Sequence, residues 1–156
     1  MVRVTYTGLG GKEAAVTVFD GLLPHVLAIR ALQAKCWPRG PDDMALEIAV
    51  DGLESAAFHF TRRPLYFDAT RVQRNHGQNF YEGLGDRAAA IRAFEGLTPY
   101  ADRLRALQGR CRPFGRDYLA LDIPRQCLGS AAYHFTRIDH FYGTKADSAG
   151  PIGPPR

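Results

Sequence analysis

The stretch SAAFHFTR at residues 55–62 recurs as SAAYHFTR at residues 130–137. The match extends outward without a gap, so that residues 6–67 align with residues 81–142 at a constant offset of 75. Roughly 29 of the 62 aligned positions are identical, whereas unrelated chains of average composition would match at about four. The sequence therefore indicates a unit that has been duplicated.

The repeat divides the chain into four segments, which are a first copy (6–67), a linker (68–80), a second copy (81–142) and a tail (143–156). A chain of 156 residues fits one domain, and both copies are needed to enclose a sizeable core. We therefore expect residues 1–156 to form a single domain. The tail is rich in Pro and Gly without periodicity, so we expect it to be disordered.

Each copy predicts a pair of helices. Pro24 and Pro99 mark the first helix of each pair, because proline suits the first helical position, and Thr98 is a suitable N-cap in the second copy. Apolar residues then recur every three or four positions as far as a loop of helix breakers. Asp42 and Asp117 are expected to cap a second, longer helix, which covers about 43–62 in the first copy. Shorter helices are expected at 12–19 and 86–94.

These elements predict an all-α fold, a pseudo-twofold four-helix bundle made of two helical hairpins with short extra helices. A stripe of small residues along each long helix favours close contact between helices. Pro124 should kink the second long helix or delay its start, and the alternative is a short strand at 119–123.

Composition predicts a cytoplasmic protein. The N-terminus lacks a signal segment, and no run approaches the roughly 18 apolar residues of a membrane span. The three cysteines are an odd number without paired spacing, which fits a reducing compartment. The formal charge of +4 leaves a basic nucleic-acid-associated protein as one hypothesis, with an arginine-rich face on the second copy.

His59 and His134 form the most suggestive pair, since the repeat places them at the same point of equivalent helices. A twofold axis that brings them together would allow haem or a divalent metal, with Asp20 and Glu95 as further metal ligands. If the axis instead crosses the long helices near Gly52 and Cys127, each His lies about 10 Å from it at opposite ends, and no shared site exists.

The residues that follow these histidines suggest an anion site. Thr61 and Arg62, with Thr136 and Arg137 in the second copy, place a hydroxyl and a guanidinium within about one turn of each histidine. The helix dipole explains cations in a last turn equally well.

No complete catalytic or cofactor motif occurs in the sequence, so we expect a non-enzymatic binding or regulatory module without a cofactor. The first hypothesis is a protein partner or self-association, with Trp37 as the contact candidate and a homodimer possible. The alternatives are a small-ligand, metal or haem binder that uses His59 and His134, and the nucleic-acid-associated protein. No membrane association is expected.

Overall fold

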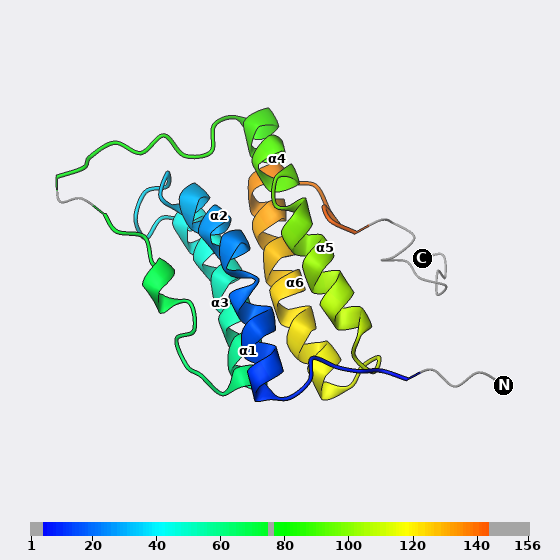
Figure 1. Cartoon of the computed structure of the whole chain (residues 1–156). Coiled ribbons are helices and arrows are strands. Elements are labelled where there is room, and N and C mark those ends of the chain that lie inside the picture. The colour runs from blue at the N-terminus through cyan, green and yellow to red at the C-terminus, as the bar shows by residue number, and fades with distance from the viewer. Residues whose placement is uncertain (1–4, 75–76, 144–156) are drawn as a thin grey trace, which may run out of the picture.

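A computed structural model describes residues 5–74 and 77–143, which fold as an all-helical molecule. A 3-10 turn at Asp68–Thr70 lies in the predicted linker, and the described residues contain no strand. The α-helices in chain order are α1 (Lys12–Asp20), α2 (Leu23–Gln33), α3 (Pro41–Thr61), α4 (Arg87–Glu95), α5 (Thr98–Gly109) and α6 (Arg116–Thr136) (Figure 1).

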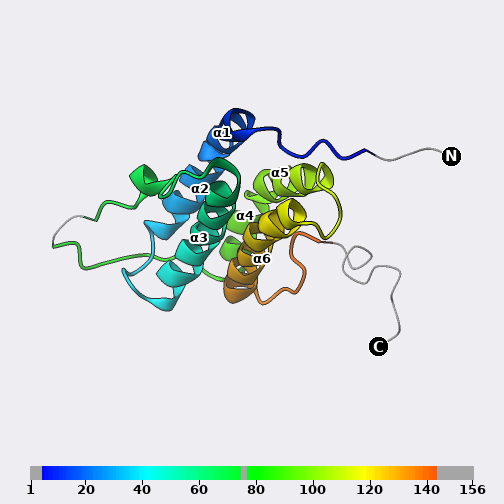
Figure 2. The same ribbon diagram turned by 90° about the horizontal axis from the view of Figure 1, so that it is seen from below.

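The two longest helices, α3 and α6, run antiparallel and form the most extensive contact between elements (Figures 1 and 2). They lie close together at Gly52, where an added Cβ would lie 2.8 Å from Cys127 Sγ and 3.2 Å from the Pro124 Cα. Ala49 and Ala56, also on the small-residue stripe of α3, are fully buried. The stripe therefore lets the two backbones approach, as helix packing requires.

Helix α6 runs through Pro124 without interruption, so the predicted short strand at 119–123 is wrong. Proline cannot donate the hydrogen bond that residue 124 would make to the carbonyl of Ala120. Pro124 is nevertheless buried, and it lies against α3 beside Gly52. Packing along the whole of α3 stabilises the helix despite this loss.

The shorter helices pack on the same pair, α1 and α2 against α3, and α4 and α5 against α6. Between α2 and α5, the rings of His25 and Tyr100 stack with their centroids 5.5 Å apart. The core is built from apolar side chains of all six helices. Its largest fully buried members include Phe19, Leu22, Ile29, Leu46, Leu53, Phe94, Tyr100, Leu104, Leu107, Leu121 and Leu128.

Three predicted helix caps are wrong. Leu97, not Thr98, is the N-cap of α5, since its carbonyl already accepts from the Tyr100 and Ala101 N–H groups in the turn that ends α4. Gly40 and Gly115, in extended conformations, are the N-caps of α3 and α6, so Asp42 and Asp117 are the second residues of these helices, within the first turn. Their carboxylates are thereby available for other partners.

The segments that precede α1 and α4 cross to the opposite half of the chain. The Gly8 N–H donates to the Arg110 carbonyl at the end of α5, and the Gly83 N–H donates to the Lys35 carbonyl after α2, each at 2.8 Å. Both glycines have a left-handed φ, +64° and +70°, which favours glycine at these positions. Each half thus satisfies a terminal carbonyl of the other half.

Two further expectations concern the C-terminal tail and membrane-spanning helices. The tail predicted from residue 143 onward lies outside the described residues except for Gly143. Among the described residues, no single helix is both long and apolar enough to cross a membrane, and α1 and α2 pass that test only as a pair bent by 43°.

Candidate functional site

The equivalent histidines of the two copies, His59 and His134, lie at opposite ends of the α3–α6 pair. His59 Nε2 is 2.8 Å from Asp117 Oδ1, and His134 Nε2 is 2.8 Å from Asp42 Oδ1. His59 and Asp42 are 17 positions apart on α3, which corresponds to about 25 Å along the helix axis. The histidines therefore do not meet, and the arrangement is the one expected for helices that cross near Gly52 and Cys127.

The predicted carboxylate partners of a metal site also lie elsewhere. Asp20 accepts a 2.6 Å hydrogen bond from the Tyr66 hydroxyl, and Glu95 is the exposed last residue of α4. Asp20 and Glu95 belong to the same half as the histidines they were predicted to accompany, whereas each histidine meets an aspartate of the other half. Within the part of the chain that the structure describes, no group of three or more His, Cys, Asp or Glu side chains could hold a metal ion.

The threonines and arginines that follow the histidines do not converge on one point. Thr61 is buried, and its hydroxyl donates to the Ala57 carbonyl at 2.7 Å and accepts from the Arg63 N–H. Arg62 lies instead over the Phe58 ring at 5.7 Å. The second half repeats this arrangement, with Thr136 bonded to the Ala132 carbonyl and Arg137 over the Tyr133 ring. A shared anion site of His, Thr and Arg is therefore not formed at either helix end.

Trp37 is 55% exposed, and its ring centroid is 5.0 Å from that of Tyr81. The Arg74 guanidinium also contacts the Tyr81 ring, 5.2 Å from its centroid. It donates a hydrogen bond to the Cys36 carbonyl at 2.8 Å. Trp37 thus packs on the other half of the chain while part of its ring faces solvent. Its role as a partner contact remains a prediction.

The cysteines offer no activated nucleophile. Burial raises the pKa of Cys36 to about 11, with Asp42 and Asp43 adding to the effect, and burial also raises the pKa of Cys111 and Cys127. A thiol with a raised pKa is largely protonated near neutral pH and reacts slowly.

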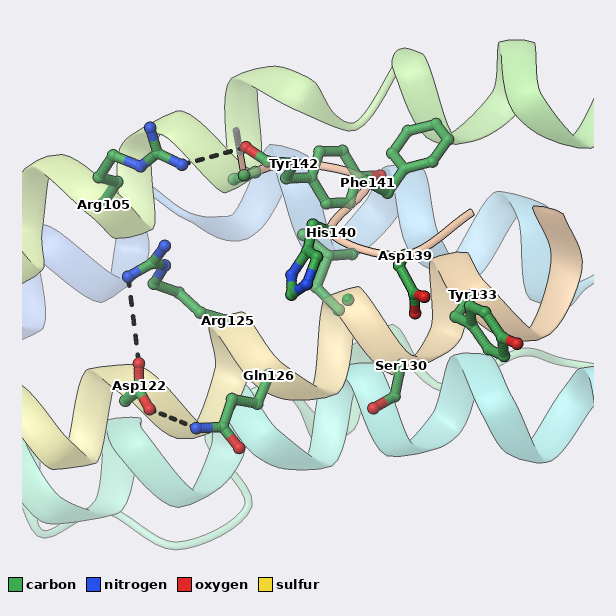
Figure 3. Close-up of a pocket in the computed structure, with 14 residues that line it drawn as sticks. Arg105, Asp122, Arg125, Gln126, Ser130, Tyr133, Asp139, His140, Phe141 and Tyr142 are labelled. Atoms are coloured by element: carbon green, nitrogen blue, oxygen red, sulfur yellow. Dashed lines mark hydrogen bonds and ion pairs between the residues drawn. The ribbon is translucent and has the colours of Figure 1, made fainter. Parts of the chain in front are cut away.

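A cavity of about 560 Å³ lies between α5, α6 and the segment that follows α6, and we call it the C-terminal groove. Arg105 and Arg125 stand at one end of it, Tyr133 and Asp139 at the other, and His140 between them (Figure 3). The remaining lining residues are Ala101, Asp122, Gln126, Leu128, Gly129, Ser130, Phe141, Tyr142 and Gly143.

Hydrogen bonds hold the walls of the C-terminal groove in place. Arg105 Nη2 donates to the Tyr142 carbonyl at 3.0 Å, which ties α5 to the segment after α6. The Tyr142 hydroxyl donates to the Phe94 carbonyl at 2.6 Å, and burial raises the pKa of this phenol, so it remains a donor. The groove is therefore preformed, as ligand sites usually are.

A second cavity of about 440 Å³, the N-terminal groove, lies between α3, α2 and the segment after α3. Arg30 is a buried residue of its wall. It donates to Gln33 Oε1 and Glu47 Oε1 at 2.8 Å and to Thr70 Oγ1 at 3.1 Å. Burial by itself would raise the pKa of Glu47, but the hydrogen bonds from Gln33 and Arg30 lower it below its usual value. The remaining lining residues are Asp51, Glu54, Ser55, Phe58, Pro64, Leu65, Asp68 and Arg71.

The two grooves occupy matching positions in the sequence. Nine of the ten residues that line the N-terminal groove have a counterpart 75 positions later that lines the C-terminal groove, and the tenth, Arg71, corresponds to residue 146, outside the described residues. Their charges differ, because two arginines face four carboxylates in the N-terminal groove and two arginines face two aspartates in the C-terminal groove. Equivalent positions of the two copies thus line two grooves that differ in charge.

Neither groove was predicted from the sequence, in which Arg105 belongs to the arginine-rich face of the second copy. One signal was present, namely that charge changes between the copies cluster on one face of the long helix. Asp51 and Glu54 become Gln126 and Gly129, whereas Val50 becomes Arg125.

Comparisons of this chain with protein families, curated proteins and solved structures gave no match. The proposed function therefore rests on the geometry of the two grooves.

Proposed function

We propose that the protein is a non-enzymatic binding module that takes a small molecule in the C-terminal groove. The observation that carries the proposal is the groove itself, since a volume of about 560 Å³ lies within the range of small-ligand sites. Aromatic side chains line it beside charged groups at fixed places, and polar groups of this kind orient a bound ligand.

We propose further that the module is a pseudo-twofold four-helix bundle that arose by duplication. The sequence repeat supports this, as do contacts that recur at the same offset, such as the two histidine–aspartate pairs. Residues with a left-handed φ recur in the same way. These pairs are Arg39 and Phe114, Arg62 and Arg137, and Leu65 and His140.

Filling each groove in turn tests the proposed site. Ser130→Trp places an indole in the C-terminal groove, and Ser55→Trp does the same at the matching position of the N-terminal groove. A fragment library would be screened by protein-observed NMR against the wild type and both variants. We expect hits whose shift changes map to the C-terminal groove, disappear in Ser130→Trp and persist in Ser55→Trp. Hits that are equally abolished by both variants, or none at all, would reject the site.

Self-association is a second candidate, favoured by an exposed apolar face on α3 and α6. Met44 and Ile48 on α3, with Leu119 and Ile123 at the matching positions of α6, are 44–50% exposed. Such a face, arranged similarly on both helices, suits an isologous contact with a second copy of the chain. In sedimentation experiments, Ile48→Glu should then abolish a dimer that Leu27→Glu, on the exposed side of α2, leaves intact. A monomeric wild type would reject this candidate.

A further inference from the structure

We infer that the ligand of the C-terminal groove is a small organic anion, whose charged group is held at the end formed by Arg105 and Arg125. This inference rests on the proposed function and specifies the chemistry of the same site.

The first argument is that Arg125 is an incompletely neutralised cation. Within the described residues its guanidinium donates from Nη1 to the neutral Gln108 Oε1, and its one ion pair, with Asp122 Oδ1, lies at 4.0 Å. Only 31% of its side chain is exposed. A guanidinium carries five N–H donors in a planar fork that suits carboxylate and phosphate, so most of its donor capacity is available to a ligand.

The N-terminal groove shows what a neutralised arginine looks like in this fold. Arg30 contacts the Glu47 carboxylate at 2.8 Å and has two further acceptors, in Gln33 and Thr70. Asp122, the counterpart of Glu47, instead accepts hydrogen bonds from the side-chain amides of Gln108 and Gln126. The carboxylate nearest to Arg125 is thus engaged by neutral donors, and the charge of Arg125 is left available to a ligand.

The second argument is that this groove holds fewer carboxylates than the N-terminal groove. Gln126 and Gly129 stand where the N-terminal groove has Asp51 and Glu54, and His140 stands where it has Leu65. An anion that enters the C-terminal groove therefore meets less repulsion. His140 adds a polar ring between the two ends of the groove (Figure 3).

The remaining walls give the ligand a direction. Asp139 is the acidic group at the end opposite Arg105 and Arg125, with Tyr133 beside it (Figure 3). Repulsion from Asp139 directs the anionic group toward the arginines, while Tyr133 and Phe141 offer aromatic surface to the body of the molecule.

Three probes that share a body and differ only in head-group charge test the inference. They are 3-phenylpropionate, 3-phenylpropanol and 3-phenylpropylamine, each titrated into the full chain by NMR with the shifts of groove residues followed. We expect 3-phenylpropionate to bind at least tenfold more tightly than the other two. Arg125→Gln should remove this preference, whereas Arg71→Gln in the N-terminal groove should leave it unchanged.

The outcomes separate the two proposals. If the alcohol or the amine binds in the groove as tightly as the acid, the inferred anion is wrong and the binding module stands. If the preference for the acid survives Arg125→Gln, the assignment of the anionic end is wrong. If none of the three shifts a groove residue at concentrations up to about 10 mM, the binding site itself is rejected together with the inference.

Discussion

Gly52 is a residue at which α3 and α6 leave no room for a side chain. A Cβ there would lie 3.2 Å from a backbone atom of α6, which cannot yield without moving the whole helix. Although alanine favours a helix by about 1 kcal/mol over glycine, overpacking typically costs 1–3 kcal/mol. We expect Gly52→Ala to lower the free energy of unfolding by up to about 2 kcal/mol in urea titrations.

Gly129 provides the matched control on α6. No atom lies within 4 Å of a Cβ added there, so Gly129→Ala should raise the free energy of unfolding by about 0.5–1 kcal/mol. A stabilising effect from both substitutions would show that the crossing at Gly52 is looser than described.

His25 makes stability depend on pH in a known direction. Its pKa lies below the usual value, because burial disfavours the charged ring and Arg103 repels it. Since the folded state binds this proton less readily than the unfolded chain, the contribution of His25 is fully present above pH 6.5 and is lost as the pH falls below it. Urea unfolding at pH 7.5 and 5.5 should therefore show a smaller loss of stability in His25→Gln than in the wild type, and an equal loss would contradict this.

At the scale of single residues, the sequence identified His59 and His134 as equivalent but not their partners. Asp117 and Asp42 were assigned to caps because they precede helical patterns, a role that any N-terminal aspartate suits. Only the crossing point of α3 and α6 determines that each aspartate meets a histidine of the other half.

At the scale of elements, Pro124 is a proline in the interior of a helix, where it removes a backbone hydrogen bond. Ala49 occupies the matching position of α3, so an alanine is compatible with the close packing there. Pro124→Ala would restore an N–H donor to the Ala120 carbonyl, and we expect it to raise the free energy of unfolding by about 1–2 kcal/mol, less than the roughly 3 kcal/mol propensity difference because ring contacts are lost. Unchanged or lower stability in thermal and urea unfolding would mean that the ring packing outweighs the missing hydrogen bond.

The helices themselves were largely predictable, because apolar spacing and proline positions are local signals. The expected helix at 86–94 corresponds to α4, where the Asp86 side chain accepts from the Ala89 N–H at 2.9 Å. The N-caps were not predictable in the same way. Gly40 and Gly115 were recognised only as breakers, and their extended conformation became evident from the structure.

At the scale of the whole molecule, an all-helical fold followed from the sequence, but the grooves did not. Each groove combines side chains from two helices with a loop that returns over them, as Arg105 and His140 illustrate. Such a juxtaposition depends on the path of the segment after the long helix, which has no periodic pattern to read. The charge differences between the copies could be read from the sequence, whereas the cavity that these residues line could not.

The crossed hydrogen bonds of Gly8 and Gly83 imply that covalent continuity between the halves is dispensable once they have met. Each half supplies a backbone donor that completes the other, and the α3–α6 contact joins them along its full length. Two separately expressed pieces, 1–74 and 77–156, should therefore reassemble into a stoichiometric complex with the spectrum of the intact chain, in the manner of a split reporter. Pieces that remain apart when mixed and co-refolded would show that tethering, rather than complementary surfaces, maintains the pairing.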